Sequence, residues 1–349
     1  MSEAPRVSVL MAVRDGAGYI RPAIDSVLRQ TVRNLELVVV DDGSTDATRE
    51  ILAAYADPRL VRVDNPGPLG LADSLNRGLA VARAEFVARQ DADDRSHPAR
   101  LEQQLAAFAA RADLALVGAQ ARRIDARGSP RGVVARPLGM AAIRWYHLFA
   151  NPFIHSAVMF RRSVVQAAGG FDHSLPRAQD FDLWSRILQR QPVLNLAARL
   201  VDYRHHATSV TESGRHAEEY ARIVRRLVAR NVEATLGERL DPAAATLLGG
   251  FDLGLERADV PDFVSLALRL AARFRERYPE AAREGEPDRT LSRQLDALAV
   301  RVRPATRGSA LAVYRAGLGA NPRLSRWLPW TRVLARLAVG PRLRRSTRA

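Results

Sequence analysis

The chain has 349 residues, of which 47% are hydrophobic and 26% charged, an ordinary globular composition long enough for two packed units. It contains no cysteine, which excludes disulfides, thiolate metal sites and cysteine nucleophiles and suits a reducing compartment. Its first residues lack the basic and apolar regions of a signal peptide, and no apolar run reaches the roughly 18 to 20 residues of a membrane span. We therefore expect a cytoplasmic protein.

Positive charge is concentrated at the C-terminus. The net charge is +15, and residues 301–349 hold twelve arginines and no acidic residue. Trp327 and Trp330 interrupt this stretch, a pattern typical of segments that lie on anionic membranes. For residues 304–349 we therefore expect peripheral contact with the cytoplasmic face of a membrane. The alternative is a solvated helix that packs on the protein through its apolar side.

The first 120 residues alternate between strand-like and helix-like patterns. Five apolar runs predict strands, at Val7–Met11, Leu35–Val40, Leu60–Asp64, Glu85–Gln90 and Leu114–Val117. Four amphipathic runs between them predict helices, at Ile20–Gln30, Asp46–Ala56, Leu71–Ala84 and Pro98–Arg111. This alternation indicates βαβ units, and hence an α/β fold with a mostly parallel, Rossmann-like sheet.

The pattern changes twice after residue 120. Residues 121–125 and 132–136 could pair as a hairpin, residues 157–160 are strand-like, and residues 180–190 are helical. From residue 213 onward the pattern is almost entirely helical, over 217–234, 241–255, 260–278 and 292–302. We predict an α/β domain over 1–212, with halves 1–119 and 120–212, followed by a helical C-terminal region with a basic tail over 213–349.

Two acidic clusters follow the second and fourth predicted strands. The first is Asp41 with Asp42, and the second is Asp91 with Asp93 and Asp94. Ligands of open α/β sheets bind outside the carboxyl ends of the strands, so both clusters are expected at one edge. Three carboxylates in four residues repel one another unless a cation neutralises them, and carboxylate oxygens suit Mg²⁺ or Mn²⁺. The sequence predicts a metal-dependent site that accepts phosphates.

Each cluster also has a plainer explanation. Asp42 is expected to bind a nucleobase or ribose, but its Asp-Gly-Ser-Thr-Asp segment also makes a good strand-to-helix turn. Asp93 is expected to bind the metal and Asp91 the ribose, although one Asp of this cluster could simply cap the following helix. An Asp-x-Asp after a strand resembles aspartyl phosphatases too, but Arg95 stands where those enzymes carry Thr or Val.

A third candidate position is Asp180, at the start of a predicted helix. A helix N-terminus keeps a carboxylate ionised, as a general base requires, and the alternative is that Asp180 only caps the helix. Asp182 and Arg186 are spaced to pair with each other. His206 is a candidate ligand for the metal or a phosphate, and His155 is a further candidate.

Five segments of the chain, in their order along the sequence, resemble the family 2 glycosyltransferases, and the resemblance spans about residues 5–212. The matching segments are Val7–Met11, Ala23–Thr31, Asp41–Asp46, Asp91–Asp94 with Pro98–Glu102, and Gln179–Trp184. The resemblance implies the nucleotide-diphosphosugar transferase fold (GT-A) and inverting chemistry. It also implies that residues 1–119 bind the nucleotide sugar and residues 120–212 the acceptor.

The resemblance assigns a role to each site residue. Asp180 is implied to be the catalytic base, and Asp93, together with His206, to hold the Mn²⁺ or Mg²⁺. The implied nucleotide-sugar contacts are Val13, Arg14, Asp41, Asp42, Asp91 and Ala92.

Three features depart from the family pattern. Arg14 stands where the family has a tyrosine that packs against the base, and Gln179 replaces a common Glu before Asp180. A Gln-x-x-Arg-Trp segment, found in processive members, is absent after Asp180. We therefore expect transfer of a single sugar rather than polymer synthesis.

The implied substrates are a nucleoside-diphosphate sugar, with UDP or dTDP favoured, and a glycan or lipid-linked acceptor in cell-surface polysaccharide or glycolipid assembly. Nucleic acid is not an expected partner. Two other classes remain open from the residues alone: a metal-dependent phosphohydrolase or nucleotidyltransferase on a similar sheet, and a non-catalytic polyanion-binding protein.

Overall fold

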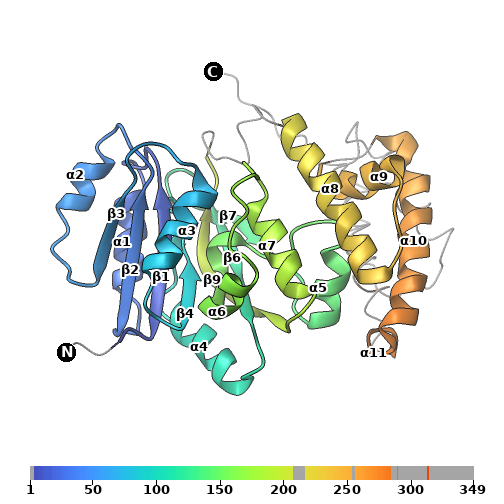
Figure 1. The fold of residues 1–349 in the computed structure, drawn as a ribbon, viewed down its shortest axis with the longest axis horizontal. Helices are drawn as coiled ribbons and strands as arrows, with labels where there is room; N and C mark the ends of the chain where they lie inside the picture. Colours follow the sequence, from blue (N-terminus) through green and yellow to red (C-terminus); the bar gives the residue numbers. More distant parts are fainter. Residues whose placement is uncertain (1–3, 207–216, 254–255, 284–288, 290–312, 314–349) are drawn as a thin grey trace. The chain divides into compact units, whose positions relative to one another are not determined.

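The computed structural model describes residues 4–206, 217–253 and 256–283, and the single residues 289 and 313 (Figure 1). Two compact units are present. One comprises residues 1–140 and 151–220, and the other comprises residues 141–150 and 221–349. The division at residue 220 lies close to the expected boundary at 212. No pattern in the sequence indicated that residues 141–150 join the C-terminal helices.

The first unit is built on a nine-stranded sheet in the order β3-β2-β1-β4-β8-β6-β9-β5, with β7 paired to β6. Four neighbouring strands are parallel: β1 (Val7–Val13), β2 (Leu35–Asp41), β3 (Leu60–Asp64) and β4 (Phe86–Arg89). The remaining strands are β5 (Arg95–Ser96), β6 (Leu116–Ile124), β7 (Pro130–Val134), β8 (Met159–Arg161) and β9 (Val193–Arg204). The expected α/β fold with a mostly parallel sheet is confirmed.

Helices of this unit lie in the five segments where helices were predicted, and one further helix, Arg162–Ala167, was not predicted. They are α1 (Ile20–Leu28), α2 (Thr48–Ala53), α3 (Leu71–Val81), α4 (Arg100–Ala110), α6 (Arg162–Ala167) and α7 (Gln179–Leu188), with a 3₁₀ turn η1 (His155–Ala157). Every residue of β1 and β2 is buried, as expected for parallel strands covered on both faces. The predicted hairpin is present as the antiparallel pair β6 and β7. The long strand β9 was not predicted.

Strand directions decide which loops meet. The carboxyl ends of β1, β2 and β4 share one edge because these strands are parallel neighbours. β8 runs antiparallel to both β4 and β6, and β9 runs parallel to β6, so β9 also ends at that edge. Because β8 is reversed, its beginning, with the η1 turn before it, lies there too.

A buried arginine joins β4 to β8 where their ladder ends. The Arg100 guanidinium donates to the carbonyl oxygens of Arg89 at 2.7 Å and Val158 at 3.1 Å, and to the Gln90 side-chain oxygen at 2.9 Å. Arg100 is completely buried, and burial lowers its pKa to about 9. These bonds join the end of β4 to the residue before β8, and they add to the Arg89 N–H that the Val158 carbonyl oxygen already accepts at 2.9 Å.

The second unit is helical. Its helices are α5 (Met140–Tyr146), α8 (Ala217–Leu236), α9 (Pro242–Leu253), α10 (Val260–Arg277) and α11 (Pro279–Arg283), with a 3₁₀ turn η2 (Arg257–Asp259). The Trp145 ring lies 5.1 Å from that of Phe149 and 5.4 Å from that of Phe274 in its core. No helix within the described ranges is long and apolar enough to cross a membrane. The predicted helix 292–302 and the basic tail 304–349 lie outside the described residues.

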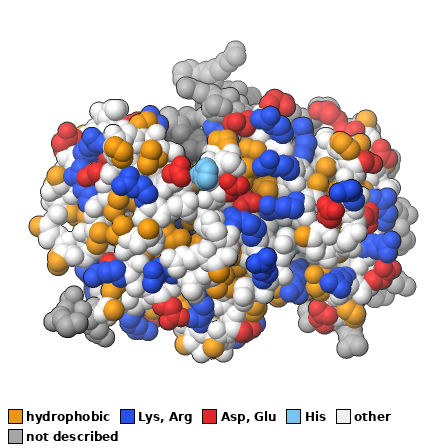
Figure 2. Space-filling model, viewed as in Figure 1, with side chains coloured by type: hydrophobic (Ala, Val, Ile, Leu, Met, Phe, Trp, Pro, Cys, Tyr) orange, Lys and Arg blue, Asp and Glu red, His pale blue; other side chains and the backbone are white. Residues whose placement is uncertain are grey.

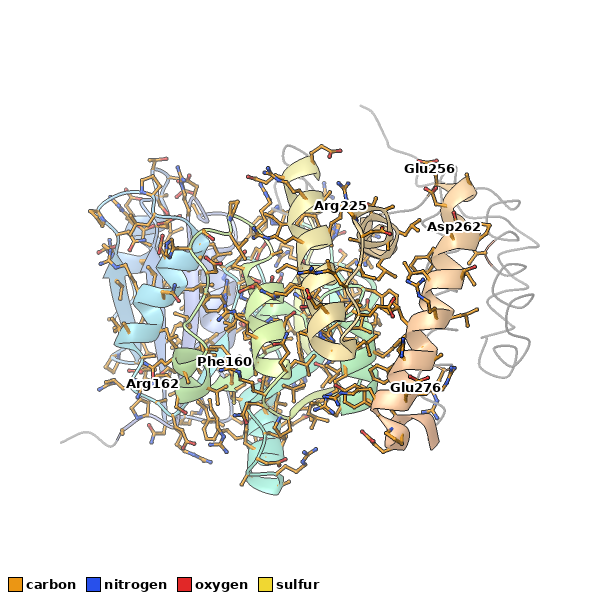
Figure 3. All side chains as sticks on the ribbon, turned by 45° about the vertical axis from the view of Figure 1, so that its right-hand side comes forward. Phe160, Arg162, Arg225, Glu256, Asp262 and Glu276 are labelled. Carbon is orange, nitrogen blue, oxygen red and sulfur yellow. The ribbon has the colours of Figure 1, made fainter. Side chains whose placement is uncertain are left out.

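Basic side chains gather on the helical unit. Figure 2 shows them in blue where α8 is drawn, and Arg222 and Arg226 of that helix are exposed. Arg225, labelled in Figure 3, is instead half-buried, and its side chain packs near Gly249 of α9. The positive charge of this unit therefore extends beyond the C-terminal tail.

His147 is a buried polar group of the same unit. Its Nδ1 lies 2.6 Å from the carbonyl oxygen of Arg144, and its Nε2 lies 3.3 Å from the hydroxyl of Thr235. A neutral ring with the proton on Nδ1 satisfies both partners, because Nε2 then accepts from the hydroxyl. Burial lowers the pKa of His147 to about 4, so the folded protein holds this ring neutral.

Stability should therefore fall as the pH drops from about 6.5 toward 4, because the unfolded chain binds a proton on His147 that the folded protein excludes. We expect His147→Gln to remove up to about 3 kcal/mol of the pH dependence of the free energy of unfolding. Urea denaturation at pH 7 and pH 4.5 measures this difference. Equal pH dependence in the variant and the parent would contradict it.

Candidate active site

The loops that follow β1 and β2 are fastened to each other. Asp15 adopts a left-handed conformation (φ 50°), and its carboxylate accepts the Thr45 N–H at 2.8 Å. In the other direction, three backbone N–H groups of the first loop donate to side chains that follow β2. Asp15 donates to Ser44, Gly16 to Thr48 and Ala17 to Asp46. Val13 is buried beside Asp41 in the ladder, whereas the Arg14 side chain is 55% exposed.

Asp41 is fully buried at the end of β2. Its carboxylate pairs with Arg49 of α2 at 2.7 Å and accepts the Ser44 N–H at 3.2 Å. Both oxygens are therefore bonded within the protein, and Asp41 holds the turn that leads into α2.

Asp42 fastens the loop between β3 and α3. Its carboxylate accepts hydrogen bonds from the Asn65 amide at 2.7 Å, the Leu69 N–H at 2.8 Å and the Gly70 N–H at 3.0 Å. Burial raises the pKa of Asp42, but these bonds outweigh it and hold the pKa below its ordinary value. The side chain therefore positions residues 65–70 at the edge of the site. Its contact with a nucleoside stays a prediction.

Two carboxylates of the second cluster are bound within the protein. Asp91 pairs with the Arg89 guanidinium, and Asp94 accepts the Ser156 hydroxyl and the Arg204 N–H, the latter at 2.7 Å. Burial, followed by repulsion from its acidic neighbours, raises the pKa of Asp94 well above its ordinary value. The expectation that a cation alone keeps this cluster together is therefore incomplete.

Asp93 and His206 face each other from different elements. The Asp93 carboxylate lies 2.9 Å from Nε2 of His206, just beyond the end of β9, and its side chain is 32% exposed. The His206 ring also lies 4.8 Å from that of Tyr19, and the Arg204 guanidinium lies 4.9 Å from the same tyrosine ring. Burial and repulsion from Asp91 raise the pKa of Asp93.

The donor set at this point fits a divalent cation. A carboxylate oxygen and an imidazole nitrogen are both ligands that Mn²⁺ accepts in proteins. Within the described ranges, no group of three or more His, Cys, Asp or Glu side chains could hold a metal. Asp93 and His206 are therefore the residues that would hold the ion, with its other ligands coming from elsewhere.

Asp180 is the second residue of α7 and is fixed from a separate segment. Its carboxylate accepts the Asn151 amide at 2.7 Å, and the Asn151 side-chain oxygen accepts the Phe153 N–H at 3.1 Å. The predicted pair Asp182–Arg186 is present at 2.7 Å, and Arg186 also donates to the carbonyl oxygen of Gly170 at 2.8 Å. This pair holds the glycine turn that leads toward Asp180.

His155 connects the acidic cluster with the Asp180 side. Its Nε2 accepts from the Arg89 guanidinium at 3.2 Å. Burial and Arg89 lower the pKa of His155, whereas Asp180 and Asp91 act in the opposite direction. Arg89 also pairs with Asp91, and the His155 ring lies 6.3 Å from that of Trp184 in α7, the helix that carries Asp180, so His155 links the two predicted parts of the site.

Four residues at the site were not predicted: Tyr19, Arg89, Asn151 and Arg204. For Arg89 the sequence carried a signal, because a charged residue ends an otherwise apolar strand two positions before Asp91. Asn151 lies 29 residues from Asp180, and no motif connects the two.

Removing the Asp42 carboxylate should destabilise the protein, because it would leave the Leu69 and Gly70 N–H groups without their acceptor. We expect Asp42→Ala to lower the free energy of unfolding by about 2 kcal/mol or more. Asp64→Ala is the matched control, since this partly exposed carboxylate ends the neighbouring strand and pairs with Arg62 rather than with loop N–H groups. Equal melting temperatures for the two variants would contradict the role given to Asp42.

This chain covers most of the length of two curated relatives. The amylovoran biosynthesis glycosyltransferase AmsE of Erwinia amylovora is 32% identical over 188 residues, 53% of this chain and 70% of AmsE. The O-antigen biosynthesis glycosyltransferase WbnJ of Escherichia coli is 30% identical over 212 residues, 59% of this chain and 82% of WbnJ.

Solved structures share the fold at lower identity. TarS of S. aureus, crystallised with UDP-GlcNAc, superposes with a TM-score of 0.55 at 18% identity, covering 91% of this chain and 92% of that structure. The mannosyltransferase PcManGT of Pyrobaculum calidifontis, with GDP-Man and Mn²⁺, gives a TM-score of 0.52 at 18% identity, covering 97% and 88%.

The family description that matches is "Glycosyl transferase family 2", over residues 8–169. This range contains both acidic clusters, Asn151 and His155. With the two curated relatives, it shows that the chain belongs to the family 2 glycosyltransferases.

Proposed function

We propose that this protein transfers a single sugar, with inversion, from a nucleoside-diphosphate sugar to an acceptor hydroxyl in the assembly of a cell-surface polysaccharide or glycolipid. The observation that carries the proposal is that His155 contacts both parts of the site: its Nε2 accepts from the guanidinium that pairs with Asp91, and its ring lies 6.3 Å from that of Trp184 in α7, the helix that carries Asp180. Asp91 and Asp180 have separate surroundings. We assign the donor to the side of Asp91 and the acceptor to the side of Asp180.

In this reaction Asp180 takes the proton from the acceptor hydroxyl. Asp180 lies in the first turn of α7, where the helix dipole interacts favourably with negative charge, and the Asn151 amide holds one oxygen in place. The deprotonated hydroxyl then attacks the anomeric carbon from the side opposite the leaving diphosphate, which gives inversion. Fixed orientation of the two reactants supplies much of the rate.

The donor would lie between the loops after β1, β2 and β4. Val13, Arg14 and Asp42 are proposed to meet the nucleoside, and Asp91 with Ala92 the ribose. Arg14 is exposed at this edge, so its guanidinium is available to stack on a base. When bound by Asp93 and His206, a divalent ion would neutralise charge on the diphosphate.

The comparisons support the substrate class. TarS was crystallised with UDP-GlcNAc and PcManGT with GDP-Man and Mn²⁺, and AmsE and WbnJ carry names from polysaccharide biosynthesis. We keep UDP- or dTDP-sugars as the favoured donors and a glycan or lipid-linked acceptor. Membrane contact through 304–349 stays a prediction, because that segment lies outside the described residues.

Donor binding can be measured before the acceptor is known. We expect one or more of UDP, dTDP, GDP and CMP to raise the melting temperature, and to do so more strongly with Mn²⁺. Release of the nucleoside diphosphate from the matching donor should then depend on a sugar acceptor. Equal release without any acceptor would favour hydrolysis and contradict sugar transfer.

Two substitutions separate the proposed base from the proposed metal ligand. Asp180→Asn should lower kcat by about 10² to 10⁴-fold and leave donor binding nearly unchanged, because only proton removal is lost. Asp93→Asn should instead weaken the Mn²⁺-dependent binding of the nucleoside diphosphate. Asp172→Asn is the control, a carboxylate bonded to the Ser174 N–H in the loop before α7. A fully active Asp180→Asn enzyme would remove the proposed base.

A further inference from the structure

Arg89 is a fully buried cation at the base of the acidic cluster. Its guanidinium reaches three elements: it donates to the Asp91 carboxylate after β4, to the Leu10 carbonyl oxygen of β1 at 3.3 Å, and to Nε2 of His155 at 3.2 Å. Neither the family resemblance nor the proposed mechanism gives this residue a role.

Burial makes the pair with Asp91 asymmetric. The Arg89 side chain is completely buried, whereas that of Asp91 is 27% exposed. Within the described ranges, Asp91 is the one carboxylate that pairs with this guanidinium. A buried charge that loses its partner is strongly destabilising, while a partly exposed carboxylate can be hydrated. Arg89 therefore depends on Asp91 more than Asp91 depends on Arg89.

His155, at the other end of the contact, is held by aromatic packing. Because Nε2 of His155 accepts from Arg89, the neutral ring carries its proton on Nδ1. The ring lies 6.0 Å from that of Phe171 and 6.3 Å from that of Trp184, which belongs to α7. Phe160 of β8, labelled in Figure 3, packs 5.8 Å from the same Trp184 ring. His155 is thus packed against the helix that begins next to Asp180.

We propose that Arg89 is a positioning residue that assembles the site, since one guanidinium holds Asp91 of the donor side and His155 of the Asp180 side together before any ligand binds. The assignment of these two sides rests on the proposed function. The contact itself does not, because it is made within the free protein.

Thermal unfolding of the free protein tests the contact without any activity. We expect Asp91→Asn to lower the melting temperature by roughly 6 °C or more, because it leaves Arg89 buried and unpaired. Arg89→Met should cost less, and Arg89→Met combined with Asp91→Asn should melt above Asp91→Asn alone. If the double variant melts no higher than Asp91→Asn, the pairing is overturned.

Asp93→Asn is the matched control for the direction of the change in melting temperature. It removes a carboxylate charge from the same cluster and keeps a side-chain oxygen facing His206, so relief of repulsion should leave the melting temperature equal or higher. If Asp91 served only as a ligand-binding carboxylate, Asp91→Asn would behave in the same way. A melting temperature of Asp91→Asn at or above that of the parent therefore overturns the proposal.

Arg89→Lys tests the contact with two partners separately from the positive charge. Its ammonium keeps the charge beside Asp91 but lacks the planar fork that reaches two partners. We expect a melting temperature near that of the parent, a donor KM within about threefold, and a kcat reduced about tenfold or more. An unchanged kcat would overturn the positioning role. If no sugar transfer is detected with the parent while the melting temperatures follow the expected order, the proposed function fails and the Arg89 contact stands.

Discussion

The site depends on charge compensation inside the protein. Three carboxylates follow β4, and three arginines lie close to them: Arg89 pairs with Asp91, the buried Arg100 donates to the Arg89 carbonyl oxygen, and Arg204 donates to the carbonyl oxygen of Asp93. Burial of carboxylates and arginines together is tolerated only when each charge has a partner or hydrogen bonds. The folded protein therefore holds part of the acidic cluster itself, while burial and repulsion within the cluster still raise the pKa of Asp93 and Asp94, so a bound cation would add to the compensation.

Strand direction does the rest of the positioning. The parallel strands β1, β2 and β4 deliver their loops to one edge, and the reversed strand β8 brings its preceding segment, with Asn151 and His155, to the same edge. A parallel strand in that place would have put the segment on the opposite edge. The donor and acceptor sides of a transferase can thus be assembled from segments that lie far apart in the sequence.

Much of the first unit could be predicted because its parallel strands are short apolar runs between turn residues, and the hairpin was indicated by a Gly-Ser-Pro turn. The strand Val193–Arg204 could not, because small and charged residues interrupt its apolar positions. The acidic positions were found from their place after strands. Whether Asp42 faces a ligand or its own loop depends on contacts with residues 65–70, which no local pattern encodes.

Residues 141–150 belong to the helical unit, which has a consequence for experiments that truncate the chain or make chimeras. These residues come from the middle of the catalytic sequence, yet they supply Trp145 and His147 to the core of the helical unit. A chain truncated after β9 would expose that tryptophan, and the C-terminal helices expressed alone would lack it. The helical unit is consequently not a detachable module, and chimeras with related transferases need to exchange both segments together.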